Sequence, residues 1–147
     1  MKIRPTLLTL GALSLGAVGF RWYNTRVETV LASSPSLILY SLNPNAMARN
    51  YSERIVDKVI ISDQVGKDEL LAATNQALHW SRASLSSCFN PRHGVSTSDG
   101  ATVLDICFEC GQVQIETGED THMVPVKREA ASLFDALVRK YHLKTVE

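Results

Sequence analysis

The chain has 147 residues, of which 45% are hydrophobic and 20% are charged, a balance that excludes a wholly disordered protein. Its formal net charge is zero, but four of its 15 bases precede the first acid, Glu28, so that 15 acids face 11 bases from there on. A part with this acidic balance lacks the positive field that attracts nucleic acid, so no nucleic-acid partner is expected.

The first 26 residues differ from the rest of the chain. A basic start precedes residues 5–20, which carry no charge and consist mainly of Leu, Ala and Gly. This layout is typical of a secretory signal peptide. As a helix the same residues span about 24 Å, so they would also serve as a short membrane anchor with Trp22 and Tyr23 at the interface. We expect residues 1–26 to be a signal peptide or a single membrane anchor, which contacts the membrane through residues 5–20 if it is not cleaved.

Either role places the remainder outside the cytoplasm, secreted or anchored to the inner membrane. Residues 27–36 are expected to be a linker, because Ser33, Ser34 and Pro35 break regular structure. Residues 37–147 are expected to form one extracytoplasmic domain.

Two strands and a helix are predicted at the start of this domain. SLILYSL (36–42) and the β-branched run RIVDKVIISDQV (54–65) are typical of strands. Residues 66–82 are expected to form an amphipathic helix with acids near its start. Its apolar face is formed by Leu70, Leu71, Thr74, Ala77 and Leu78.

Three β-like runs follow, at residues 88–97, 101–109 and 111–117, and Ser98-Asp99-Gly100 predicts a hairpin turn between the first two. Residues 121–127 are expected to be a connector. The last element is an amphipathic helix with bases in its final turn. Its apolar positions are Ala130, Leu133, Phe134, Leu137, Val138 and Tyr141.

These elements predict an α+β fold. We expect a small antiparallel sheet with two amphipathic helices on one face, preceded by the N-terminal apolar helix.

All three cysteines and one histidine lie in a single stretch, spaced Cys88-x4-His93-x13-Cys107-x2-Cys110. Three thiols and one imidazole, arranged along the chain as one Cys–His pair and one Cys–Cys pair, suit a tetrahedral zinc site. A hairpin can aim both sulfurs of the Cys-x2-Cys pair at one point. The spacing therefore predicts a structural zinc site formed by Cys88, His93, Cys107 and Cys110.

Three other interpretations of the cysteines stay open. Outside the cytoplasm Cys107 and Cys110 would oxidise to a disulfide, with Cys88 outside it. Cys88 with His93, or the Cys-x2-Cys pair, would form a thiol enzyme. Cys107 and Cys110 would also suit plain core positions.

Nearby charges have two interpretations each. Arg92 either pairs with Asp105 or holds an anionic ligand, and Glu109 is either a general base or an exposed turn residue.

Three segments of the chain, ILYSLNP (38–44), CFNPRHG (88–94) and LDICFECGQVQI (104–115), resemble a family of small, often exported bacterial proteins of no assigned activity. The resemblance covers about residues 38–116, and its specific part is the pair of motifs CFxPRHG and DxCFECxQ. KVIISDQV departs from the family pattern, because no Gly follows its first apolar stretch. The resemblance implies no reaction. It implies that the residues to test for a function are Cys88, Pro91, Arg92, His93, Cys107, Phe108, Glu109 and Cys110.

The expected function is that of an exported or membrane-anchored binding or scaffold module with zinc as its cofactor, acting on an unidentified protein partner and not as an enzyme. A thiol enzyme using Cys88 and His93 or the Cys107/Cys110 pair is one alternative. A disulfide-stapled interaction domain is the other.

Overall fold

A computed structural model describes residues 26–45, 51–78 and 87–146. Residues 26–33 are helical. The elements that follow are β1 (Leu37–Leu42), a 3₁₀ turn (Tyr51–Arg54), β2 (Ile55–Ile61), α2 (Gln64–Ala77), β3 (His93–Thr97), β4 (Thr102–Cys107), β5 (Gln112–Thr117), β6 (Asp120–Pro125), a second 3₁₀ turn (Arg128–Ala130) and α3 (Ala131–Lys140).

The six strands form one sheet in the order β2-β1-β3-β4-β5-β6, and every neighbouring pair is antiparallel. The predicted α+β class with an antiparallel sheet is therefore confirmed. The predicted turn between β3 and β4 is also present, where Gly100 N donates to Thr97 O at 3.0 Å. The connection from β2 to β3 carries α2, so β1 lies between two strands that follow it in the chain.

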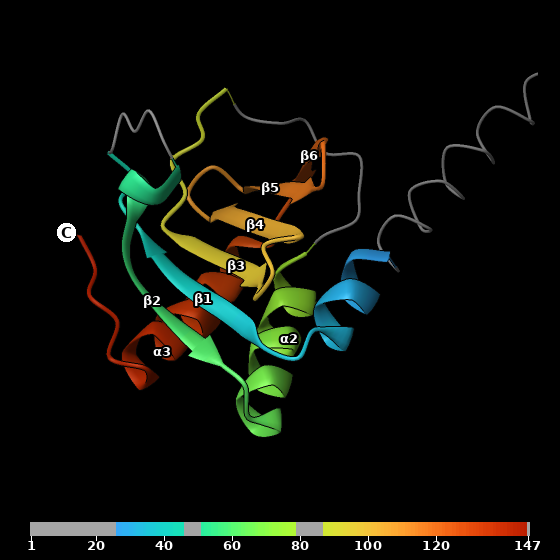
Figure 1. The fold of residues 1–147 in the computed structure, drawn as a ribbon. Helices are drawn as coiled ribbons and strands as arrows, with labels where there is room; N and C mark the ends of the chain where they lie inside the picture. Colours follow the sequence, from blue (N-terminus) through green and yellow to red (C-terminus); the bar gives the residue numbers. More distant parts are fainter. Residues whose placement is uncertain (1–25, 46–50, 79–86, 147) are drawn as a thin grey trace, which may run out of the picture.

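One face of the sheet is covered by α2, α3 and the helix formed by residues 26–33 (Figure 1). Val95 and Leu104 project from the strands and pack with Leu70 of α2 and Phe134 of α3, and all four side chains are fully buried. Each such side chain contributes about 1.5–3 kcal/mol by leaving water. This helix-covered face holds the main core of the domain.

The opposite face of the sheet carries a smaller apolar cluster, formed by Ile38, Tyr40 and Leu42 with Ile55 packed against them. Side chains alternate between the two faces of a strand, so these residues of β1 point away from the helices. Tyr40 and Ser96 share a hydrogen bond of 2.9 Å between their hydroxyl groups on this face. We call it the outer face.

The expected linker, residues 27–36, is in part a structural element of the domain. The helix at 26–33 buries Val27 and Leu31 to 1% and 0% exposure in the main core. These two residues stand four apart, which places them on one side of a helix. The Ser and Pro residues that suggested a linker instead terminate this helix.

Further boundaries also differ from expectation: α2 begins at Gln64 and not at residue 66, and β3 begins at His93 and not at Cys88. The strand expected at 54–65 ends at Ile61, because the Asp63 side chain accepts a hydrogen bond from Gly66 N at 2.8 Å and caps α2. Most of the expected connector at 121–127 belongs to β6, an edge strand whose first three residues are exposed. Exposed edge residues show no apolar alternation, which is why the sequence pattern did not reveal this strand.

The expected signal peptide or anchor lies outside the described residues, apart from Arg26. Within the part of the chain that the structure describes, no helix is both long enough and apolar enough to span a membrane.

Candidate thiol–disulfide centre

The turn between β4 and β5 positions two of the three cysteines. Cys107 ends β4 and pairs across the hairpin with Gln112, the first residue of β5. Gly111 closes the turn with a φ of +70°, a conformation that only glycine adopts readily, and donates from its N to Phe108 O at 3.2 Å. This geometry brings Cys107 and Cys110 to a Cα–Cα distance of 5.3 Å, and they form a disulfide.

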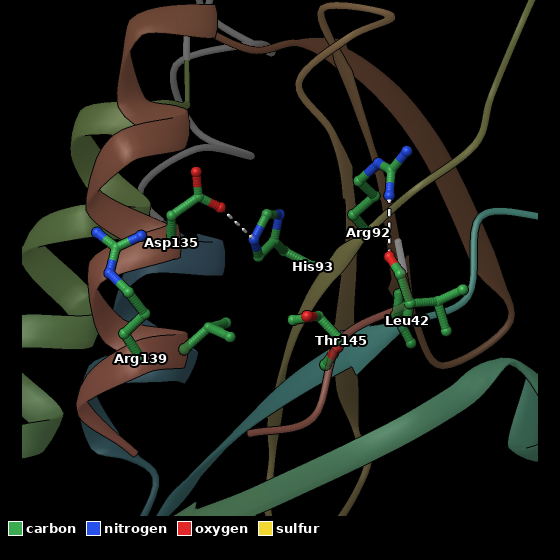
Figure 2. A pocket seen from close by; sticks show the side chains of 9 residues that line it. Leu42, Arg92, His93, Asp135, Arg139 and Thr145 are labelled. Atoms are coloured by element: carbon green, nitrogen blue, oxygen red, sulfur yellow. Dashed lines mark hydrogen bonds and ion pairs between the residues drawn. The ribbon is translucent and has the colours of Figure 1, made fainter. Parts of the chain in front are cut away.

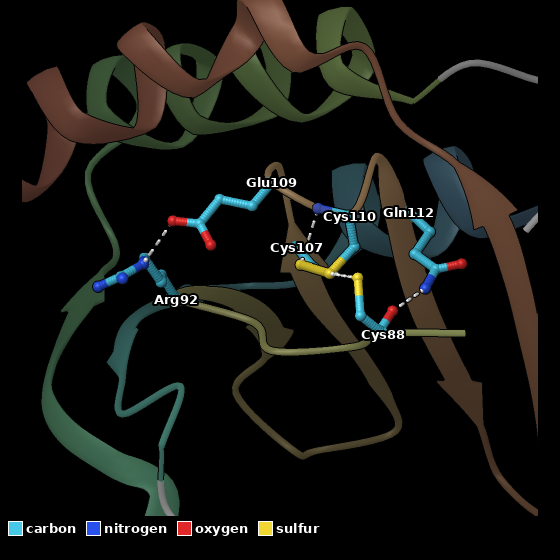
Figure 3. The surroundings of a disulfide bond; sticks show 6 residues. All are labelled: Cys88, Arg92, Cys107, Glu109, Cys110 and Gln112. Atoms are coloured by element: carbon cyan, nitrogen blue, oxygen red, sulfur yellow. Dashed lines mark hydrogen bonds and ion pairs between the residues drawn. A yellow bond between two sulfur atoms is a disulfide. The ribbon is translucent and has the colours of Figure 1, made fainter. Parts of the chain in front are cut away.

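The third cysteine reaches the same point from the segment before β3. Arg92 N donates to Ile106 O at 3.3 Å, and Leu42 N donates to Arg92 O at 2.9 Å, so this segment continues the path of β3 between its neighbours. The Gln112 side-chain amide donates to the carbonyl oxygen of Cys88. Figure 3 shows the result, in which the Cys88 side chain points at the disulfide.

The three sulfur atoms form one cluster. Cys88 Sγ lies 2.8 Å from Cys110 Sγ, and Cys110 Sγ is bonded to Cys107 Sγ. Cys107 is 1% exposed and Cys110 is 8% exposed, whereas Cys88 is exposed to solvent. The backbone N of Cys110 donates to Cys107 Sγ at 3.2 Å. The thiol of an exposed residue therefore contacts one sulfur of a buried disulfide.

His93 is placed away from this cluster. It pairs with Ile106 across β3 and β4, and paired residues of antiparallel strands project from the same face. Ile106 belongs to the main core beneath the helices, so the next residue, Cys107, projects from the outer face. The His93 ring packs edge-on against Phe108 and Phe134, with centroid distances of 5.6 and 5.7 Å.

The imidazole of His93 is held by α3. Its Nε2 lies 3.2 Å from Oδ1 of Asp135, and its Nδ1 is buried without a hydrogen-bond partner among the described residues. Burial lowers the pKa of His93 below its ordinary value. The Asp135 carboxylate acts against this by raising the pKa, while the positive charge of Arg92 lowers it further.

A cavity of about 320 Å³ lies beside this pair, between the ends of β1 and β3, α3 and the C-terminal tail. Arg92 and Arg139 stand on opposite sides of it, with His93 and Asp135 between them (Figure 2). Arg92 also donates to Val146 O at 3.4 Å. Guanidinium groups bind carboxylate and phosphate groups well, so the cavity has the donors that a small anion needs.

Two ion pairs involve the charged residues near the cysteines. Arg92 pairs with Glu109 at 3.3 Å, and the nearly buried Asp105 lies 3.8 Å from Arg54 of the first 3₁₀ turn. The Glu109 side chain is 69% exposed, as its interpretation as a turn residue requires.

The structure brings together three of the four predicted zinc ligands, Cys88, Cys107 and Cys110. The fourth, His93, contacts α3. No group of three or more Cys, His, Asp or Glu side chains in the described ranges is arranged to hold a metal ion. Zinc binding thus stays a prediction.

Asp135 and Phe134 were not anticipated as neighbours of His93, because their only signal was the helical periodicity of α3. Gln112, which holds Cys88, was visible in the sequence only as the last position of the DxCFECxQ motif.

Comparison of the chain with protein-family models, curated proteins and solved structures found no match.

Proposed function

We propose that this protein is a thiol–disulfide exchange module that acts on protein thiols outside the cytoplasm. The observation that carries the proposal is the 2.8 Å contact between the thiol sulfur of Cys88 and Cys110 Sγ of the Cys107–Cys110 disulfide. Exchange proceeds by attack of a thiolate on a disulfide sulfur, so a thiol held against a disulfide is the arrangement that the reaction needs.

The substrate class follows from the electron balance. A partner with two thiols reduces the Cys107–Cys110 disulfide and leaves with a disulfide of its own. Two electrons and two protons pass to the module, which ends with thiols at both positions. The reverse reaction lets the reduced module accept a disulfide from a partner. Neither direction needs a cofactor.

The disulfide also supports the proposed location. Disulfides persist in secreted and periplasmic proteins and are rare in the cytosol. This agrees with the interpretation of residues 1–26 as a signal peptide or membrane anchor, with residues 5–20 in the bilayer if it is retained. The domain would then act from the outer surface of the inner membrane, or after secretion.

A structural zinc site in a binding or scaffold module is the second candidate, and the same convergence of sulfur atoms favours it. Three thiolates at one point are most of a tetrahedral site. Zinc requires all three sulfurs reduced, whereas exchange requires two of them to cycle through a disulfide. Redox state and metal content therefore separate the two functions.

The experiment is a redox titration of the purified chain in glutathione buffers of graded ratio, with acid quenching and mass spectrometry of thiol-labelled protein. Exchange predicts a reversible two-electron transition that assigns to Cys107 and Cys110, together with a trapped glutathione adduct. The Cys107→Ser/Cys110→Ser double variant should lack the transition.

Two results would refute the proposal. A disulfide that stays oxidised in every buffer would mark a purely structural bond. Stoichiometric zinc in the freshly purified protein, with all three thiols masked until a chelator is added, would instead establish the metal site.

A further inference from the structure

The three sulfurs differ in how easily another protein can reach them. The disulfide sulfurs belong to residues that are 1% and 8% exposed, whereas Cys88 is exposed. A partner thiolate must approach a disulfide sulfur from the side opposite the bond it breaks. In the observed state the buried Cys107–Cys110 bond offers a protein partner little access, whereas Cys88 is an exposed residue whose sulfur contacts that bond.

Cys110 takes part in both the disulfide bond and the contact with Cys88. Its sulfur is bonded to Cys107 and lies 2.8 Å from Cys88 Sγ, and Figure 3 shows Cys110 Sγ between the other two sulfurs. A Cys88 thiolate therefore faces Cys110 on the side away from Cys107. That approach breaks the existing bond and expels the Cys107 sulfur.

The expelled sulfur already has a stabilising donor. The backbone N–H of Cys110 points to Cys107 Sγ at 3.2 Å, and a hydrogen bond to a thiolate is stronger than one to a neutral sulfur. A stabilised thiolate leaves more readily. The attacking sulfur is likewise held in position, because the Gln112 side chain binds the Cys88 carbonyl oxygen.

We infer that Cys88 is a relay, which takes the disulfide from the buried pair and presents it to the partner. This inference rests on the proposed exchange function. In the first step the Cys88 thiolate attacks Cys110 Sγ, a Cys88–Cys110 bond forms, the Cys107–Cys110 bond breaks, and Cys107 leaves as a thiolate. No electron leaves the protein in this isomerisation.

In the second step a partner thiolate attacks the sulfur of the exposed residue Cys88, which forms a mixed disulfide and expels the Cys110 thiolate. The second thiol of the partner then attacks the partner's first sulfur, which is bonded to Cys88, and expels the Cys88 thiolate. The partner leaves oxidised by two electrons, and all three cysteines of the module are reduced, with protons taken from solvent.

The test is single-turnover oxidation of a reduced two-cysteine peptide by the oxidised full chain. The variants are Cys88→Ser, which keeps the Cys107–Cys110 pair, and Ser87→Ala, an exposed neighbour that serves as the control. The relay predicts that Cys88→Ser slows peptide oxidation by about tenfold or more, whereas Ser87→Ala leaves the rate unchanged. Mass spectrometry before the reaction verifies that each variant contains the disulfide.

A second variant tests the intermediate directly. Cys107→Ser removes the third sulfur, so the relay predicts a Cys88–Cys110 disulfide that peptide mapping identifies, and a mixed disulfide to the peptide through Cys88. Oxidation of the peptide by Cys88→Ser at the wild-type rate would overturn the relay while the exchange function stands. Failure of the wild-type chain to exchange at all would refute the exchange function itself.

Discussion

Nε2 of His93 lies 3.2 Å from Oδ1 of Asp135, and this contact joins the first residue of β3 to the middle of α3. The imidazole is buried on the helix-covered face, and its second nitrogen has no partner within the described part of the chain. A protonated imidazole would need a partner for both N–H groups, so the site favours the neutral form. Burial accordingly lowers the pKa of His93.

This lowered pKa predicts a loss of stability as the pH falls. As the pH falls below about 6.5, His93 is protonated in the unfolded chain before it is protonated in the folded chain. Protonation therefore stabilises the unfolded state first. The contribution of His93 is present above its unfolded pKa and is lost as the pH decreases toward its folded value. The slope approaches at most about 1.4 kcal/mol per pH unit.

Urea unfolding between about pH 7.5 and 5 measures this slope, because most carboxylates titrate below that window. His93→Gln keeps a side-chain donor for Asp135 but does not titrate. The variant should show a flatter dependence of the unfolding free energy on pH than the wild-type chain. Identical slopes in the two proteins would assign the pH dependence to other groups.

Gln112 is expected to hold Cys88 against the disulfide. Gln112→Met keeps the length of the side chain but removes the amide that donates to the Cys88 carbonyl. Loss of this hydrogen bond should cost about 0.5–1.5 kcal/mol, and the released Cys88 should react faster with iodoacetamide in the oxidised protein. Gln114→Met changes the same side chain two residues along β5 and is the matched control, because Gln114 bonds only Glu116 among the contacts described. Equal alkylation rates in both variants would argue against the anchoring role.

The helix at residues 26–33 should behave as part of the folded domain. Leu31 is fully buried in the main core, so Leu31→Ala should destabilise the protein by about 2–5 kcal/mol in equilibrium unfolding. The neighbouring Ala32 is exposed, and Ala32→Ser should have little effect. An equally small effect of Leu31→Ala would restore the interpretation of this segment as a linker.

Reduction of the Cys107–Cys110 disulfide should leave the domain folded. The bond closes a very short loop, with a sequence separation of 3, and loop-closure entropy predicts a loss of about 2 kcal/mol. Urea unfolding with and without a phosphine reductant measures this difference. A domain that unfolds on reduction would contradict a redox-active role, because the reduced state must persist during turnover.

Local patterns in the sequence were enough to predict most of the helices and strands and the class of the fold. The strand at 36–42 follows from a short apolar run, and both amphipathic helices follow from period-3.6 patterns, which need no knowledge of the neighbours. The sequence also identified the stretch from Cys88 to Cys110 as the place of interest, because all the cysteines lie there.

Which of these residues contact each other depends on how the strands and helices pack. His93 pairs with Ile106 and so projects from the same face of the sheet, whereas Cys107, the next residue, projects from the other face. This can be deduced only when the register of β3 on β4 is known. A shift of one residue would reverse it, since side chains alternate along a strand. This register places the His93 imidazole on the face opposite the sulfurs, where it contacts Asp135. The turn at Gly111 brings Cys107 and Cys110 together. Contacts between distant segments depend on strand pairing and helix packing, which local patterns do not encode.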